Sequence, residues 1–212
     1  MIDTIAMIGS PASRGAVASV SGAGRACLAA GRACLASAVT DPVALATGLM
    51  QHPKVKMHGP EHHFLVPAAL LTAYDNLRGD PSAKASHLRE ARRRAETVIG
   101  GMCGFHGACG AAIGIGIFVS LVTGATPLAR EAWSLSNLAT SEALAVIARR
   151  GGPRCCKRDT WLAILAAVRF ARAHLGVTLP LGPRDPCGFS GKNRECLEQR
   201  CPFYRGGAAA PA

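Results

Sequence analysis

Residues 102–120 read MCGFHGACGAAIGIGIFVS, a glycine-rich turn with two cysteines and a histidine that leads directly into an apolar segment. The most apolar run, 108–123, holds 16 residues and three glycines. A helix that spans a membrane requires about 20 predominantly apolar residues. The stretch therefore predicts a buried core helix that follows a cysteine-bearing loop, and no membrane-spanning segment.

The composition of the whole chain favours the same class of structure. Its 212 residues are enough for one domain with a sizeable core. Hydrophobic residues make up 49% of the chain but aromatic residues only 5%, so the apolar content is mostly Ala, Val, Leu and Ile. Such residues suit closely packed helices better than a sheet. We expect an all-α protein, a single compact helical domain with cysteine-bearing loops at helix N-termini and an irregular cysteine-rich tail.

Glycine and proline divide the chain into three parts. We expect an Ala-rich helical segment over 1–50, a helical cysteine-rich core over 51–178 and a cysteine-containing tail over 179–212. Within the core, capping and turn residues predict five helices. These are an apolar helix that a Gly-Pro turn opens and Gly79 ends, a charged helix from Ser82 to about Val98, a helix after the 103–109 loop, one from Pro127 to about Ala148, and one from near Asp159 to before Gly176.

The N-terminal segment contains a short internal repeat, GRACLAAGRACLA, at 24–36. It places Cys27 and Cys34 seven residues apart, which puts both on one face of a helix. We interpret them as small buried or half-buried core residues.

The net charge of +11 comes largely from arginine, and its densest run is HLREARRRAE at 87–96. At helical spacing Glu90 faces Arg94 and Arg92 faces Glu96, which predicts a solvated helix face. A nucleic-acid surface would combine clustered cations with aromatic stacking platforms, and two Tyr and two Trp offer little for that. The sequence argues against a nucleic-acid partner.

Nine cysteines are unusual for a chain of this length. A disulfide scaffold is typical of short secreted chains, and the N-terminus shows no clear signal peptide. A reducing compartment, in which thiolates bind metal, fits better. We therefore expect a cytoplasmic protein.

Two cysteine loops lie at expected helix starts. Cys103 and Cys109 flank His106 in the first loop, and Cys155 and Cys156 follow a Gly-Gly-Pro turn in the second. Helix N-termini stabilise thiolates, and the cations Arg154, Lys157 and Arg158 surround the second pair. The alternative is that these cysteines are only small core residues. We expect thiolate or metal chemistry, with the two loops meeting in space.

The cysteine spacing does not match a zinc ribbon, which needs two Cys-x₂₋₄-Cys pairs. Soft thiolates with nearby cations suit an iron–sulfur cluster better, so we expect one [4Fe–4S] cluster, or two, with zinc as the alternative. The tail adds three cysteines, and it either binds a second cluster or supplies a ligand to the first. The candidate metal ligands are Cys103, Cys109, Cys155, Cys156, Cys187, Cys196 and Cys201.

The run GACGAAIGIGIFVSLVTGATP, followed by SNLATSEAL and CCKRD, resembles the alpha region of iron–sulfur L-serine dehydratases and related cysteine desulfidases. The resemblance covers about residues 100–170. It implies that Cys109 matches the first cluster cysteine, Cys155 the cysteine before the Lys-Arg pair, and Asn137 a polar helix position. That family has a further cluster cysteine between these two, where this chain offers VIARRGGPR, so Cys103 or Cys156 would take its place.

The whole pattern HGPEHH, CGFHGACG, GGPRCCKRD, NREC and CPF more closely resembles an uncharacterised cysteine-rich domain family of anaerobes. No reaction is established for that family. The resemblance implies a helical fold and a cluster but no particular substrate.

The histidines are the candidates for proton transfer. Glu61 with His58 and His62 could act as acid and base beside a cluster, and so could His106. The alternative for 58–63 is a capped helix start with exposed histidines.

The sequence favours iron–sulfur-dependent chemistry, lyase- or desulfidase-like, on a small sulfur- or hydroxyl-bearing substrate. Three thiolates would hold a [4Fe–4S] cluster whose open iron acts as a Lewis acid or accepts sulfide. Arg154, Lys157 or Arg158 would bind a substrate carboxylate. The second hypothesis is a non-catalytic sulfur or electron carrier for a partner enzyme, and the third is a zinc-stabilised binding module. The sequence does not specify the oligomeric state.

Overall fold

The computed structural model describes residues 21–206, so the first 20 residues of the expected N-terminal segment and 207–212 of the tail lie outside it. The described chain contains eight α-helices, two short 3₁₀ helices and no strand, which confirms the all-α prediction. The helices are α1 (Gly22–Ala36), α2 (Pro42–Gln51), α3 (Glu61–Arg78), α4 (Pro81–Ala95), α5 (Met102–Phe105), α6 (Gly110–Thr123), α7 (Arg130–Arg150), α8 (Cys156–His174), η1 (Ser190–Lys192) and η2 (Glu198–Arg200).

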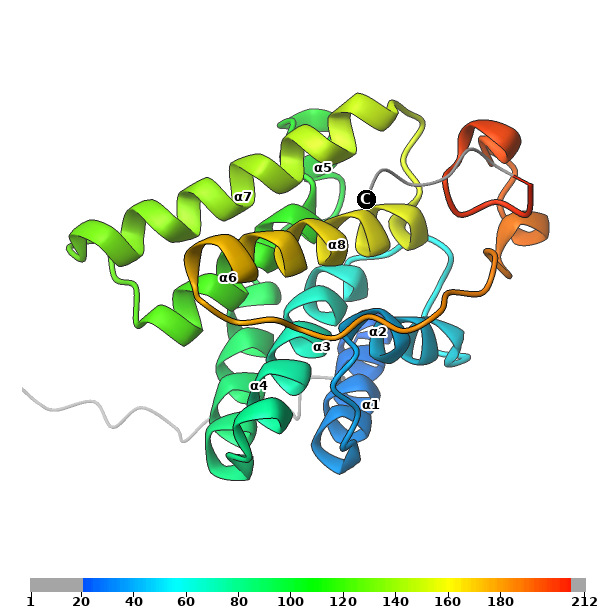
Figure 1. The fold of residues 1–212 in the computed structure, drawn as a ribbon. Helices are drawn as coiled ribbons and strands as arrows, with labels where there is room; N and C mark the ends of the chain where they lie inside the picture. The colour runs from blue at the N-terminus through cyan, green and yellow to red at the C-terminus, as the bar shows by residue number, and fades with distance from the viewer. Residues whose placement is uncertain (1–20, 207–212) are drawn as a thin grey trace, which may run out of the picture.

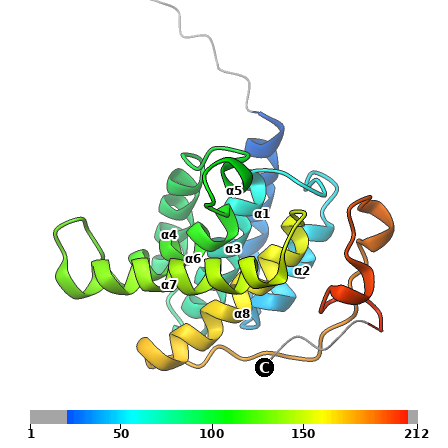
Figure 2. The same ribbon diagram turned by 90° about the horizontal axis from the view of Figure 1, so that it is seen from above.

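Helix α3 forms the centre of the fold. Helices α1, α2, α4, α6 and α8 all contact it, and it lies between them in Figures 1 and 2. Its sequence is apolar on every face from Phe64 to Ala73, as a helix surrounded by others requires. It ends at Gly79, whose positive φ of 63° closes the last turn as the sequence predicts.

Helix α6 is the buried helix expected from the opening stretch, and it packs between α3 and α7. Its glycines permit close approach. A Cβ atom at Gly114 would lie 2.8 Å from Cδ of Pro67 and 3.0 Å from Cβ of Val66, and one at Gly116 would overlap the Thr140 hydroxyl. The glycine-spotted pattern therefore reflects tight helix packing.

Replacing Gly114 by Val tests this packing. Overpacking of this kind costs about 1–3 kcal/mol, so we expect the melting temperature to fall by several degrees. The control is Gly48→Val on α2, where a Cβ atom meets nothing within 4 Å. Thermal unfolding that affects both variants equally would contradict the close approach of α6 and α3.

Several helix boundaries differ from the predicted ones. Helix α4 begins at Pro81 because the Asp80 carboxylate, rather than Ser82, accepts the N–H of Ala83 at 2.8 Å, and it ends at Ala95. Helix α7 begins at Arg130, after a turn that contains Pro127. Helix α8 begins at Cys156, three residues before the predicted start near Asp159. The sulfur of Cys155 caps this helix.

The remaining local predictions hold. Cys27 and Cys34 are both buried on α1, where burial raises the pKa of Cys27 to about 12 and that of Cys34 to about 11. On α4, Arg92 donates to Glu96 and Arg94 to Glu90, each at 2.8 Å. None of the helices within 21–206 is both long and apolar enough to cross a membrane.

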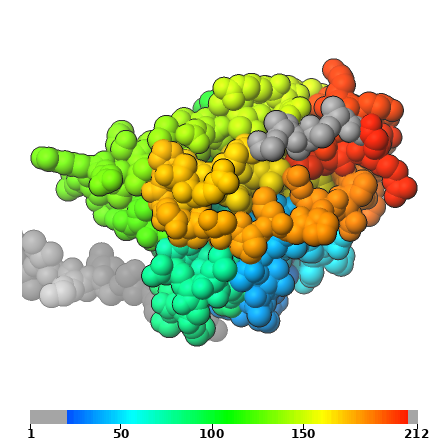
Figure 3. All heavy atoms as spheres, in the orientation of Figure 1, coloured from blue at the N-terminus to red at the C-terminus, as the bar shows by residue number. Residues whose placement is uncertain are grey.

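The tail beyond α8 returns across the molecule to the start of that helix. Its first part runs past α2, where the N–H of Gly182 donates to Asp41 at 2.7 Å. Its second part contains η1 and η2 and closes on itself through the N–H of Cys187 and the carbonyl of Phe203. Figure 3 shows the tail, in orange and red, covering one face of the protein. Phe189 and Phe203 pack on Trp161 with ring centroids 5.9 and 5.0 Å away.

Candidate functional site

The start of α8 is fixed by a buried arginine. Arg158, 3% exposed, donates from Nε to the carboxylate of Asp159 at 2.9 Å and from Nη2 to the carbonyls of Gly151 and Pro153 at 3.1 and 3.2 Å. These bonds hold the Gly-Gly-Pro turn against the first turn of the helix. They place Cys155 and Cys156 at a defined helix N-terminus.

Cys155 faces the returned tail. Together with three tail cysteines it lines a small cavity whose other walls include Trp161, Phe189 and Leu197. We call these four residues the tail cysteine group: Cys155, Cys187, Cys196 and Cys201.

Backbone N–H groups point at three sulfurs of the tail cysteine group. Arg158 donates to Cys155 at 3.5 Å, Phe189 to Cys187 at 3.4 Å, and Glu198 to Cys196 at 3.4 Å. Such donors favour the thiolate. Desolvation outweighs them in the free thiols, raising the pKa of Cys155 to about 11 and also raising that of Cys187. A bound metal cation would therefore be needed to deprotonate Cys155 and Cys187 at neutral pH.

A second set of cysteines lies on the other side of the α8 start. A cavity of about 710 Å³ is lined by Cys103 and Cys109 of the first loop, by Arg154 and Asp159 of the second, and by apolar residues of α7. Both cysteine loops thus contribute residues to one cavity, although neither Cys155 nor Cys156 lines it. An open cavity of this volume with a partly apolar wall is typical of a small-molecule site.

Cys156 lines neither of these two cavities, but it interacts electrostatically with Cys109 of this second set. Desolvation raises the pKa of Cys156 to about 12, the N–H of Gly59 lowers it, and a charge on Cys109 raises it. Desolvation likewise raises the pKa of Cys109 to about 11, against the N–H groups of Ala111 and Ala112 at the start of α6. We call Cys103, Cys109 and Cys156 the cavity cysteine group.

Neither group is a closed mononuclear metal site. Among residues 21–206, no group of three or more His, Cys, Asp or Glu side chains is arranged to hold a metal ion. A structural zinc ion needs four donors about 2.0–2.3 Å from one point. What fits a metal group is the kind of donor: four cysteines line the tail cavity and two line the larger one, with backbone N–H groups and cations beside them.

The histidine region 58–63 lies against the α8 start. His58 shares a hydrogen bond of 3.3 Å with Asn193 of the tail, and its Nδ1 is buried with no partner in the described chain. Burial raises the pKa of Asp159, whereas Arg158 and, more weakly, His58 lower this pKa. His58 therefore lies close enough to the start of α8 to interact with Asp159.

The other predicted proton-transfer residues are placed less favourably. His62 is 2% exposed, and burial lowers its pKa to about 3, so it stays neutral; the alternative of exposed histidines is wrong for this residue. Glu61 is also buried and accepts the N–H of Lys56 at 2.8 Å. His106 is exposed on the first loop.

The predicted substrate-binding residues do not all lie at the large cavity. Arg154 and Arg158 both line the large cavity, but Nε and Nη2 of Arg158 already donate to Asp159 and to the Gly-Gly-Pro turn. Lys157 turns to the opposite side, donates to the carbonyl of Met50 at 3.1 Å, and has a pKa that burial lowers to about 8. Asn137 is exposed on α7 and donates to the carbonyl of Trp133.

Two residues at this site were missed in the sequence. Asp159 was predicted only as a helix cap, although its place in CCKRD, beside two cysteines and a buried arginine, was a usable signal. No signal in the sequence pointed to Asn193, because its contact with His58 joins positions 135 residues apart.

Residues 31–204 match a family described as "Family of unknown function (DUF5714)", and the chain belongs to it. This confirms the predicted membership of an uncharacterised domain family. No curated protein and no solved structure matches the chain.

Proposed function

For this member of a family of unknown function, we propose an iron–sulfur protein that acts on a small sulfur- or hydroxyl-bearing substrate. One observation carries the proposal: seven cysteines gather round the start of α8 in two groups, and two members of one group, Cys103 and Cys109, line a cavity of about 710 Å³. Two [4Fe–4S] clusters account for both groups. The proposed setting is a reducing, anaerobic cytoplasm.

The donors favour a cluster over a zinc ion. Cysteines that line a cavity without converging on one point suit an inorganic group larger than a single ion. Arg158 and Arg154 lower the pKa of Cys155 and Cys156 respectively, against the larger effect of burial, and would balance part of the negative charge of the thiolates. A [4Fe–4S] cluster held by only three thiolates has an open iron, which supplies a Lewis acid.

The chain's own residues would bind the substrate and move its proton. Arg154 lines the cavity with no ion pair in the described chain, so its planar guanidinium is free to bind a carboxylate through two hydrogen bonds. The buried pair Arg158–Asp159 fixes the loop on which Arg154 sits. His58, with an unpartnered Nδ1 and an electrostatic interaction with Asp159 of the cavity wall, would accept or donate a proton.

The second candidate function is a sulfur or electron carrier. The tail cysteine group favours it, because four thiolates would leave no open iron. A zinc-stabilised binding module is the third, and it requires the same four sulfurs to close on one ion.

The experiment that separates these functions uses matched amino acids. Anaerobically prepared protein is titrated with L-cysteine, L-serine or L-alanine while the electron paramagnetic resonance spectrum of the reduced protein is recorded. We expect L-cysteine or L-serine to change the spectrum and L-alanine, which lacks the thiol or hydroxyl, to leave it unchanged. An iron-containing protein whose spectrum responds to none of the three would favour the carrier.

A further inference from the structure

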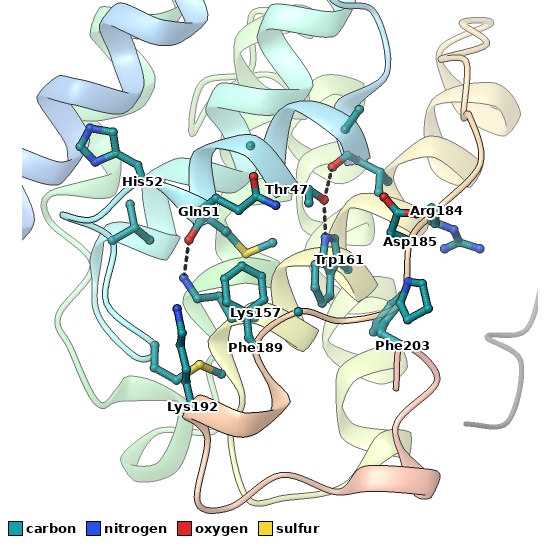
Figure 4. Close-up of a pocket in the computed structure, with 18 of the residues that line it drawn as sticks. Thr47, Gln51, His52, Lys157, Trp161, Arg184, Asp185, Phe189, Lys192 and Phe203 are labelled. Carbon is teal, nitrogen blue, oxygen red and sulfur yellow. Dashed lines mark hydrogen bonds between the residues drawn. The ribbon is translucent and has the colours of Figure 1, made fainter. Parts of the chain in front are cut away.

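A second cavity, of about 600 Å³, lies on the opposite side of α8 from the cavity cysteine group. It is bounded by α2, by the start of α8 and by the tail (Figure 4). Its volume is in the range of small-molecule sites. None of the seven cysteines assigned above lines it.

Lys157 supplies a buried positive charge to this cavity. The residue is 1% exposed, its Nζ donates to the carbonyl of Met50 at 3.1 Å, and it lies 4.7 Å from the ring centroid of Phe189. An ammonium carries three donors. No other acceptor and no ion pair is found for this Nζ within residues 21–206. The buried carboxylate of Glu61 attracts this charge without forming an ion pair with it. A buried charge with one hydrogen bond and no ion pair is costly unless an anion joins it.

Lys192 brings a second charge to the same place. Figure 4 shows its side chain rising from η1 toward that of Lys157, so that the two ammonium groups face one another. Unlike the buried Lys157, Lys192 is an exposed residue that solvent can reach. Two cations that converge on one cavity create a site for a negatively charged group.

The carboxylates of the cavity do not neutralise these lysines. Asp41 is occupied by the N–H groups of Val43, Ala44 and Gly182 at 2.8, 3.1 and 2.7 Å. Asp185 lies at the far end of the cavity, next to Arg184 (Figure 4). The lining also includes the apolar residues Val55, Met57 and Phe189.

We propose that this cavity binds a small organic carboxylate, with its carboxylate group between Lys157 and Lys192 and its apolar body along Val55, Met57 and Phe189. The site does not depend on the proposed chemistry at the cavity cysteine group. Because η1 forms one wall, binding also requires the returned tail.

The test measures binding of benzoate, hexanoate and succinate to the full chain by isothermal titration calorimetry. The uncharged amides of the same acids are the matched control ligands. We expect at least one of the acids to bind saturably and its amide to bind roughly tenfold more weakly or not at all, as loss of a charge-assisted hydrogen bond implies. Failure of all three acids to bind, or equal binding of acids and amides, would overturn the proposal.

The variant Lys192→Met tests whether the acid binds in this cavity. It removes an exposed charge without disturbing the core, and we expect it to weaken binding of the acid roughly tenfold. Lys54→Met removes an exposed lysine that does not line the cavity, and should leave binding unchanged. Equal affinity in the wild-type and Lys192→Met proteins would place the bound acid elsewhere and contradict the site.

Discussion

Replacing Cys109 by Ser should remove the iron of the cavity cysteine group and leave that of the tail cysteine group in place. Cys109 precedes α6, and its sulfur lies where the N–H groups of Ala111 and Ala112 favour a thiolate. A serine hydroxyl is a much harder and less acidic donor, so a group held by three thiolates is not expected to survive on two. We expect about half of the iron and acid-labile sulfide to be lost.

The matched control is Cys27→Ser. Cys27 is buried on α1 and belongs to neither group, so its replacement should keep the full iron content. Metal analysis of the two variants after anaerobic purification makes the comparison. A Cys109→Ser protein with as much iron as the Cys27→Ser protein would remove the cavity cysteine group from the account.

Replacing Cys201 by Ser should release the tail. This cysteine is buried at 7% exposure, and its group lines the cavity between the tail and the start of α8. If a metal group bridges the four sulfurs, its loss leaves the contacts of Phe189 and Phe203 with Trp161 as the main attachment. We expect tryptic cleavage at the exposed Arg194, Arg200 and Arg205 to accelerate by roughly tenfold or more, because cleavage follows local opening.

Cys34→Ser serves as the control, because Cys34 is equally buried but lies on α1. Its cleavage rate in the tail should match the wild type. Equal protection of the tail in the Cys201→Ser and wild-type proteins would show that aromatic packing alone holds it, and that no metal bridges the group.

The sequence predicted those parts of the fold that depend on local pattern. The buried helix α6, the stop of α3 at Gly79 and the ion pairs of α4 all follow from residues within a few positions of one another. Helix starts were less predictable where two cap residues compete, as Asp80 and Ser82 do before α4. At α8 the cap is a cysteine sulfur, a residue outside the usual capping preference.

The division of the cysteines depended on contacts that no local pattern encodes. Cys155 and Cys156 are neighbours in sequence, yet one lines the tail cavity and the other interacts with Gly59 and Cys109. Which side each sulfur takes depends on where the tail returns. That return is fixed by long-range contacts such as that of Gly182 with Asp41.

The most direct test of the central claim is a count of iron, acid-labile sulfide and zinc in the full chain purified without oxygen. Two [4Fe–4S] groups predict a brown protein with about eight irons and about eight sulfides per chain and almost no zinc. A colourless protein that carries stoichiometric zinc, or one with no metal, would contradict the account.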